Sequence, residues 1–312
     1  MARVARVSDF LGLTRSTVGV LFMVILVGMG ERMAERFLPI YLLALGGGAL
    51  SIGLLNGMDN LLSALYSFPG GYLSDRFGTK RALLIFNTVA MCGFLIVIIY
   101  PAWQAVLLGA VLFISWSAIS LPATMSLIAK VLPMRKRTMG VSMHSLVRRI
   151  PMALGPVLGG VCIGIWGERD GVRAAFVAAL LLSFLAIVLQ QKLIEDEPGK
   201  KTGDKWLYVP EKNPLKLYRL MAPNLRRLLV SDILVRYCEQ IPYAFVVVWC
   251  MKTISSPVSA LQFGILTSIE MATAVLVYVP VAYLADKTTK KPFVVMTFVF
   301  FTLFPLTLLF CH

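Results

Sequence analysis

The chain has 312 residues, of which 58% are hydrophobic, and its mean hydropathy is +0.80. Soluble globular domains contain about 45–50% apolar residues, so this composition excludes an ordinary water-soluble domain. The formal net charge of +14 would suit a nucleic-acid-binding protein, but the sequence offers no basic platform with interleaved aromatic residues, and we expect no nucleic-acid partner.

Charge-poor apolar runs recur along the chain. A run of about 18 or more apolar residues indicates a membrane-spanning helix. By this criterion the sequence predicts nine spans, at residues 17–44, 50–73, 82–100, 103–130, 139–166, 173–192, 227–251, 260–284 and 293–311. Several exceed the roughly 20 residues needed to cross a bilayer, so we expect them to tilt or to protrude.

The basic residues gather on one side of these predicted spans. If the N-terminus is cytoplasmic, 22 of the 30 Lys and Arg residues fall on cytoplasmic segments, three on the opposite side and five within spans. This is a strong positive-inside bias. It predicts a multi-pass protein of the plasma (inner) membrane with a cytoplasmic N-terminus, in contact with the lipid bilayer.

Cysteine usage and the absence of catalytic motifs narrow the function further. The five cysteines fall in apolar spans without metal-ligand spacing, so we expect small buried packing residues: Cys92, Cys162, Cys238, Cys250 and Cys311. No nucleophile–base set and no phosphate-binding loop is apparent in the sequence. The sequence therefore predicts neither an enzyme nor a metal site, and no cofactor.

A stretch of the chain occurs twice. Residues 49–81 align without a gap on residues 260–292, and ten positions are identical. Asp59 aligns with Glu270, so a carboxylate recurs where hydrocarbon is expected. An internal repeat in a membrane protein is typical of transporters built from two related halves.

The repeat predicts an all-α polytopic fold in two blocks. We expect a complete six-helix N-terminal bundle at residues 1–192, a polar cytoplasmic linker at 193–226 and a partial, three-helix C-terminal bundle at 227–312. Six plus six helices would complete such a repeat. We therefore expect the chain to be truncated after its ninth span, or to find the missing helices elsewhere.

The turn between the second and third spans carries a specific motif, Gly71-Tyr-Leu-Ser-Asp75-Arg76-Phe-Gly78-Thr-Lys80-Arg81. It resembles the signature loop of the major facilitator superfamily, G-x-L-[A/S]-D-R-x-G-R-[K/R]-[K/R], with Thr79 in place of one Arg. A weaker copy without the glycines stands at residues 283–287. The resemblance implies conformational-switch loops formed by Gly71, Asp75, Arg76, Gly78, Lys80, Arg81, Asp286 and Lys287.

Ionisable residues lie inside five of the predicted spans, where charges are expensive and face a cavity or one another. These candidates for substrate or proton binding are Glu31, Arg32, Glu35, Arg36, Asp59, Arg148, Arg149, Arg236, Glu239 and Glu270. Two interpretations stay open: a polar cavity that binds substrate and exchanges protons, or a static ion-pair network. In the superfamily every third helix faces lipid, and spans three, six and nine carry no charge in their middles.

The fifth span contains a run of small residues and prolines. Gly155 and Gly159 form a small-xxx-small face that permits close helix approach, and the candidate packing residues are Gly155, Pro156, Gly159 and Gly160. The Gly-Pro-x-x-Gly-Gly run resembles the end of a motif found in proton-driven exporters of the superfamily. The upstream glycines of that motif are absent, and the fourth span lacks the mid-membrane Arg of many proton-coupled members.

The resemblance implies a secondary active transporter of small organic solutes that works by alternating access. We expect it to be proton-coupled, with export slightly favoured, as in an efflux antiporter, so its partners would be a small-molecule substrate and protons. The alternative is a truncated, non-transporting membrane partner or sensor. The sequence names neither the substrate nor the oligomeric state.

Overall fold

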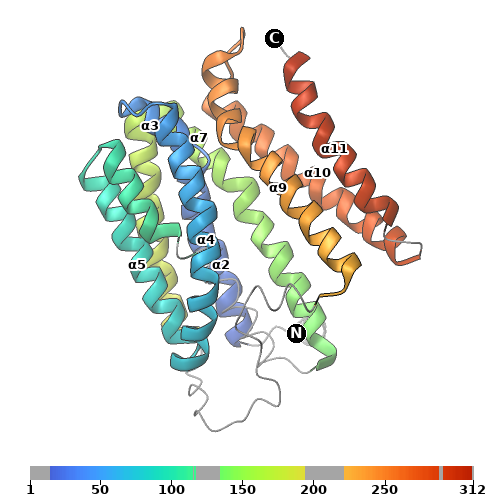
Figure 1. The fold of residues 1–312 in the computed structure, drawn as a ribbon. Coiled ribbons are helices and arrows are strands. Elements are labelled where there is room, and N and C mark those ends of the chain that lie inside the picture. Colours follow the sequence, from blue (N-terminus) through green and yellow to red (C-terminus); the bar gives the residue numbers. More distant parts are fainter. Residues whose placement is uncertain (1–14, 115, 117–133, 194–220, 288–290, 311–312) are drawn as a thin grey trace, which may run out of the picture. The chain divides into compact units, whose positions relative to one another are not determined.

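The computed structural model describes residues 15–114, 116, 134–193, 221–287 and 291–310 (Figure 1). These residues form helices, and no strand occurs among them. The elements are α2 (Arg15–Glu35), α3 (Leu38–Ala44), α4 (Ala49–Phe77), α5 (Thr79–Ile99), α7 (Met134–Leu193), α9 (Pro223–Val248), the π-helix η1 (Trp249–Thr253), α10 (Ala260–Lys287) and α11 (Lys291–Phe310). The all-α class expected from the sequence is confirmed for these residues.

The first predicted span is two helices rather than one. α2 ends at Glu35 and α3 begins at Leu38, with Pro39 in the first turn of α3. Proline has no backbone N–H and its ring clashes with the carbonyl four residues earlier, which here is that of Glu35. The helix therefore stops before Pro39 and restarts around it. The break leaves Arg36 and Phe37 between the two helices.

Glycines mark two further turns. Gly78 separates α4 from α5 with φ of 84°, and Gly167 interrupts α7 with φ of 79°. Both angles lie in the left-handed region, which glycine adopts without a Cβ penalty. α7 is therefore two helices, one before and one after Gly167, in the region where the sequence predicts spans at residues 139–166 and 173–192.

Three stretches among the described residues are long and apolar enough to cross a membrane: Lys80–Ile99, Leu146–Leu193 and Ala260–Val277. Shorter apolar helices occupy Trp103–Ile114, Tyr243–Thr253 and Pro292–Leu308. The fourth predicted span continues to residue 130, and residues 117–130 lie outside the described part of the chain. The same holds for most of the predicted linker, although α9 already begins at Pro223.

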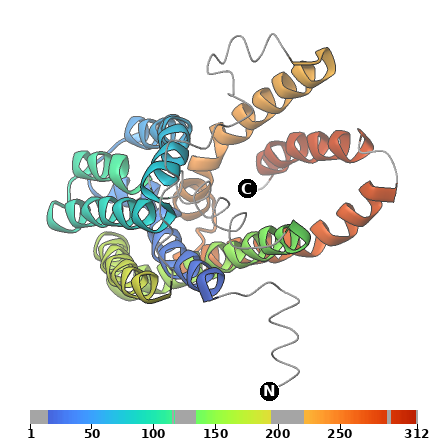
Figure 2. The same ribbon diagram turned by 90° about the horizontal axis from the view of Figure 1, so that it is seen from below.

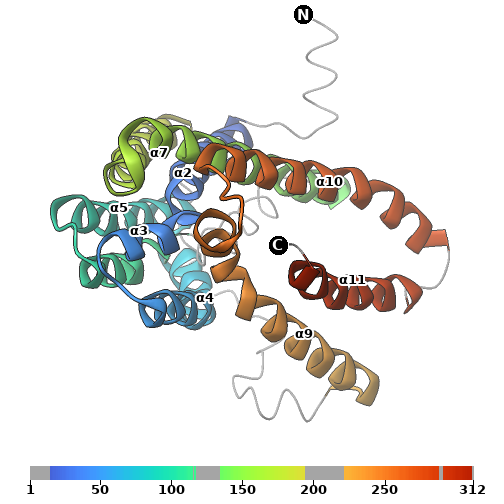
Figure 3. The same ribbon diagram turned by 90° about the horizontal axis from the view of Figure 1, so that it is seen from above.

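The described residues divide into two compact units. The first comprises those within 1–200 and 258–274, and the second those within 201–257 and 275–312, so α10 begins in one unit and ends in the other. In the first unit α2 packs along α7, and α5 packs on both α4 and α7 (Figure 2). In the second unit α9 contacts α11 (Figure 3).

An aromatic core packs part of the first unit. The rings of Phe94, Phe113 and Phe176 lie with centroids 5.7–5.9 Å apart, and Tyr41 lies 6.5 Å from Phe176. Such offset and tilted ring pairs add stabilisation beyond the area they bury. The cluster joins α3, α5, the 103–114 segment and the second helix of α7.

Polar side chains in this core bond to backbone carbonyls. The buried Asn87 amide on α5 donates to the Ser183 carbonyl on α7 at 3.1 Å. At the end of the same helix pair, Gln190 donates to the Lys80 carbonyl at 2.7 Å, and the Lys80 ammonium donates to the Gln191 carbonyl at 3.2 Å. Carbonyl acceptors are fixed by the helix, so these bonds set the register of α5 on α7.

Candidate functional site

The last turn of α2 is a charged turn that begins the candidate site. Arg32 and Glu35 are three residues apart and share a helix face. The Arg32 Nη1 atom lies 2.8 Å from Glu35 Oε2, and it donates to Glu35 Oε1 at 3.0 Å. The two side chains keep 26% and 36% of their surface exposed, so the pair is not sealed in the packed core.

Charged groups from α4 and α7 gather around this pair. Asp59 on α4 interacts electrostatically with Glu35 and Arg32, and it accepts a hydrogen bond from the Ser63 hydroxyl at 3.5 Å. Arg148 on α7 interacts with Arg32, with Glu35 and with Glu31. Of the sequence candidates, the structure therefore brings Glu31, Arg32, Glu35, Asp59 and Arg148 together in the first unit, and we call these five residues the charged cluster.

The break between α2 and α3 joins the charged cluster to the start of α10. Arg36 Nη2 lies 3.7 Å from Glu270 Oε2, and the Arg36 guanidinium carbon lies 5.5 Å from the centroid of the Phe263 ring. Phe37 meets Phe263 edge-on, with centroids 6.1 Å apart. An Arg guanidinium over an aromatic face is attracted by the ring quadrupole. Arg36 and Phe37 thus contact α10 at two points, Phe263 and Glu270, which are about two turns apart.

The first helix of α7 and the start of α10 form a seam of paired positions that run in opposite directions. A Cβ on Gly160 would lie 2.5 Å from the Ala260 carbonyl oxygen, and one on Gly264 would lie 2.5 Å from that of Pro156. One turn further along, Ser268 donates to the Ala153 carbonyl at 2.5 Å. Small side chains allow backbones to approach this closely.

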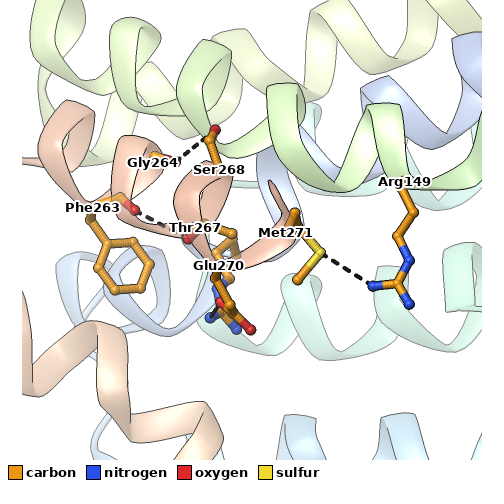
Figure 4. Close-up of polar contacts among 8 residues, drawn as sticks. Arg149, Phe263, Gly264, Thr267, Ser268, Glu270 and Met271 are labelled. Atoms are coloured by element: carbon orange, nitrogen blue, oxygen red, sulfur yellow. Dashed lines mark hydrogen bonds and ion pairs between the residues drawn. The ribbon is translucent and has the colours of Figure 1, made fainter. Parts of the chain in front are cut away.

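The three contacts at Gly160, Gly264 and Ser268 are the first three steps of the seam, and the fourth step involves long side chains. There the Arg149 Nη1 atom donates to the Met271 Sδ atom at 3.8 Å (Figure 4). Figure 4 also shows Glu270 and Phe263 on the same stretch of α10, so this stretch contacts α7 through one set of side chains and Arg36 through another. Two long side chains meet here, whereas small residues form the contacts elsewhere along the seam.

The other face of the small residues in α7 lies against α2. A Cβ on Gly159 would overlap the Met33 carbonyl oxygen, and one on Gly155 would lie 2.6 Å from Arg32 Cβ. Gly155 and Gly159 therefore face α2, whereas Gly160 and Pro156 face α10. On the same helix, the Arg148 side chain interacts electrostatically with Arg32 in the charged turn of α2.

Several sequence candidates lie where the structure describes only the backbone. Arg236 and Glu239 are on α9, Gly71, Asp75 and Arg76 are in the last turns of α4, and Asp286 and Lys287 end α10. Their side chains lie outside the described part, and their roles stay predictions. Of the remaining loop residues, Gly78 forms the turn and Lys80 bonds α7, while Arg81 is exposed.

Sequence reasoning missed the residues through which α10 makes its contacts. Phe263, Ser268 and Met271 carry no charge and fit no motif, so nothing marked them individually. The spacing of Ala260, Gly264 and Ser268 at intervals of four did contain a signal, because small residues at this spacing indicate a close helix contact. The sequence held no corresponding signal for Met271.

The fold and this site define a multi-pass helical membrane protein with ionisable groups gathered among its helices. The sequence profile of the Major Facilitator Superfamily matches residues 20–312, and the chain belongs to that family. Members of this family are membrane transporters, which supports the expectation that the protein is a transporter and not an enzyme.

Individual relatives agree with this assignment. The chain is 28% identical over 167 residues to the MFS-type transporter YqjV of Bacillus subtilis, covering 52% of this chain and 38% of that protein. It is 25% identical over 189 residues to an MFS-type transporter of Methanocaldococcus jannaschii, covering 57% and 45% respectively. The matched regions thus span less than half the length of these relatives.

Solved structures share the fold. An inward-facing bacterial homologue of the human lysosomal transporter Spinster superposes with a TM-score of 0.70 at 15% identity, covering 88% of this chain and 63% of that one. A peptide transporter crystallised with sulfate superposes with a TM-score of 0.65 at 14% identity, covering 88% and 69%. At these identities the likeness establishes the fold alone.

Proposed function

We propose that the protein is a secondary active transporter that moves a small organic solute across the membrane by alternating access, coupled to protons and directed outward. The observation that carries this proposal is the charged cluster, together with the Arg36–Glu270 pair. Charges at membrane depth face a cavity or one another, because lipid solvates them poorly. In this chain they are paired and keep part of their surface exposed, which supports a cavity.

The cluster has the composition that a proton-coupled cycle needs. Asp59 interacts electrostatically with one carboxylate, that of Glu35, and one guanidinium, that of Arg32. Protonation of Asp59 would remove a negative charge from beside Arg32 and would strengthen the hold of Arg32 on Glu35. Release of that proton would loosen the same pair. A proton on Asp59 can thus change which carboxylate Arg32 neutralises.

Partial exposure favours the cavity interpretation over a static network. The Glu270 side chain is 51% exposed and that of Arg36 is 16% exposed, at a separation of 3.7 Å. Because solvent reaches the Glu270 side of the pair, we expect it to contribute little to stability, at most about 1 kcal/mol. A network that serves only to hold helices together would be expected to use short, enclosed pairs.

The loops and small residues identified from sequence complete the proposal. We assign conformational switching to the loop from Gly71 to Arg81 and to its weaker copy at Asp286 and Lys287. We place the protein in the plasma (inner) membrane with its N-terminus in the cytoplasm, because the basic residues favour that side of the predicted spans. Close helix contacts at Gly159 and Gly160 would provide the rigid surfaces that move during the cycle.

Transport by the purified, complete protein in liposomes tests the proposal. A panel of small organic solutes would be presented with and without an imposed proton gradient, while a trapped dye reports internal pH. We expect at least one solute to move protons in exchange, and we expect Asp59→Asn and Glu35→Gln to abolish the exchange. Solute movement that ignores the gradient and survives both substitutions would remove the proton role. No movement of any solute would favour the partner or sensor alternative.

A further inference from the structure

The arginines of the site differ in what they bind. Arg32 has a carboxylate oxygen at 2.8 Å and Arg36 has one at 3.7 Å. Arg149 lies within 4.0 Å of no carboxylate among the described residues, and its hydrogen bond goes to the Met271 sulfur at 3.8 Å. A guanidinium has five N–H donors, and a thioether is a weak acceptor. Among the described residues, the Arg149 side chain therefore has this one weak acceptor.

The surroundings of Arg149 favour an anion over a further protein contact. Its neighbour in sequence, Arg148, is a second guanidinium, and the two repel each other electrostatically. Arg148 also interacts with a third guanidinium, that of Arg32. The Glu270 carboxylate, next to Met271 on α10, pairs with Arg36. Arg149, unlike Arg148, thus has no carboxylate partner among the described residues.

The seam also provides a reason why a ligand would enter here. Its other three steps are closed by Gly160, Gly264 and Ser268, where backbones nearly touch. At the fourth step α7 and α10 meet through two flexible side chains, Arg149 and Met271 (Figure 4). Methionine is unbranched and adapts its shape readily, so it can move aside at low cost.

We propose that Arg149 binds the oxyanion of the transported solute, and that Met271 covers the guanidinium when no solute is bound. This inference deepens the proposed function and rests on it, because it names the substrate class as a small organic anion. The planar fork of a guanidinium matches a carboxylate, and it binds phosphate and related oxyanions in the same two-pronged way. Met271 would swing away as the anion arrives, and the solute body would lie along the seam.

Binding to the complete protein in a neutral detergent tests this assignment without requiring transport. The probes are benzoate, benzenesulfonate and phenyl phosphate, each compared with neutral benzamide, and the readouts are the thermal midpoint and the dissociation constant. We expect at least one anion to bind more tightly than benzamide, and Arg149→Gln to weaken it by about 10-fold to 100-fold, as expected for a hydrogen bond to a charged group. Arg149→Lys should retain part of the affinity.

Two further variants separate a binding role from a structural one. Arg169→Gln removes the same charge from an exposed position of α7 and should leave the anion affinity unchanged. Met271→Leu removes the sulfur and keeps the guanidinium, so affinity should stay within about threefold of wild type or increase, because the sulfur is a weak acceptor. A lower affinity for Met271→Leu than for Arg149→Gln would contradict the proposal.

Lipid headgroups are a second source of oxyanions, and measurements in bilayers of two compositions distinguish them from soluble anions. The same measurements would be made in nanodiscs of phosphatidylcholine, with and without phosphatidylglycerol. We expect the soluble anions to bind in both. Equal binding of anions and benzamide, anion binding that Arg149→Gln leaves unchanged, or binding of phosphatidylglycerol alone would each overturn the assignment. Arg149-dependent anion binding without any flux would instead refute the transport proposal and leave this inference standing.

Discussion

The two helices of α7, before and after Gly167, use polar groups in opposite ways. The second helix joins an aromatic core, and its polar contacts with α5 run to backbone carbonyls, as in the bond from Asn87 to Ser183. The first helix faces the charged cluster, where polar contacts run between ionic side chains. Carbonyls are fixed by the helix, whereas ionic side chains can exchange partners. We infer that the second helix has a structural, scaffold role and that the first helix takes part in transport.

Overpacking the first helix should have the largest effect. Gly159→Leu would drive a side chain into the Met33 carbonyl of α2, and such overpacking typically costs about 1–3 kcal/mol and occasionally more. We expect a large loss of monodisperse protein in size-exclusion chromatography. Gly164→Leu is the matched control, because nothing lies within 4 Å of a Cβ at that position. Equal losses from both would show that the α2–α7 contact is not the cause.

Removal of a scaffold hydrogen bond should come next. Asn87→Leu deletes the buried donor to the Ser183 carbonyl, and we expect about 1–3 kcal/mol lower stability because the carbonyl loses this partner. The exposed Thr88, whose hydroxyl bonds the Leu84 carbonyl in its own helix, provides the control Thr88→Val. The measurement is the thermal midpoint in detergent. A transport defect without a stability defect would contradict the scaffold role.

In the charged cluster we expect the opposite result, a transport defect with little loss of stability. Asp59→Asn should change the thermal midpoint little and should lower proton-driven flux by about tenfold or more, the equivalent of at least 1.4 kcal/mol. Asp170→Asn is the control, since Asp170 is a 67% exposed carboxylate that pairs only with Arg173 in its own helix among the described ion pairs. Equal fluxes in the two variants would place the coupling carboxylate elsewhere.

The Arg36–Glu270 pair should give the smallest energetic effect. Its separation of 3.7 Å and the 51% exposure of Glu270 imply strong solvent screening. A double-mutant cycle with Arg36→Gln and Glu270→Gln should give a coupling of less than about 1 kcal/mol, decreasing with added salt. A coupling of several kcal/mol that ignores salt would identify a static, structural pair and would favour the network interpretation.

The sequence predicted the family and helix content because both depend on local signals. Apolar runs and the loop around Gly78 lie within a few dozen residues of chain, and each copy of the internal repeat, at residues 49–81 and 260–292, is equally short. The break after Glu35 was missed although Pro39 marks it, since the length of the apolar run outweighed one proline. The bounds of the predicted bundles stay predictions, as do the roles of Arg236 and Glu239.

The site was predicted only in part, because charge identifies candidates but not their partners. Glu35, Asp59 and Arg148 were selected as costly residues in spans, and the structure gathers them. The partners on α10 depend on contacts between positions more than 100 residues apart, such as Arg149 with Met271. No periodicity in one helix specifies which residue of another helix will face it.

Access of water to the charged cluster is the most direct test of the account. Single cysteines would replace Asp59 and, as a lipid-facing comparison, Leu181, which is apolar and 64% exposed on the second helix of α7. The background would lack the five native cysteines, and the reagent would be a charged, membrane-impermeant thiol label applied to vesicles. The account predicts labelling at position 59 and none at position 181. Labelling at neither position, or only at 181, would contradict a water-filled path through the charged cluster.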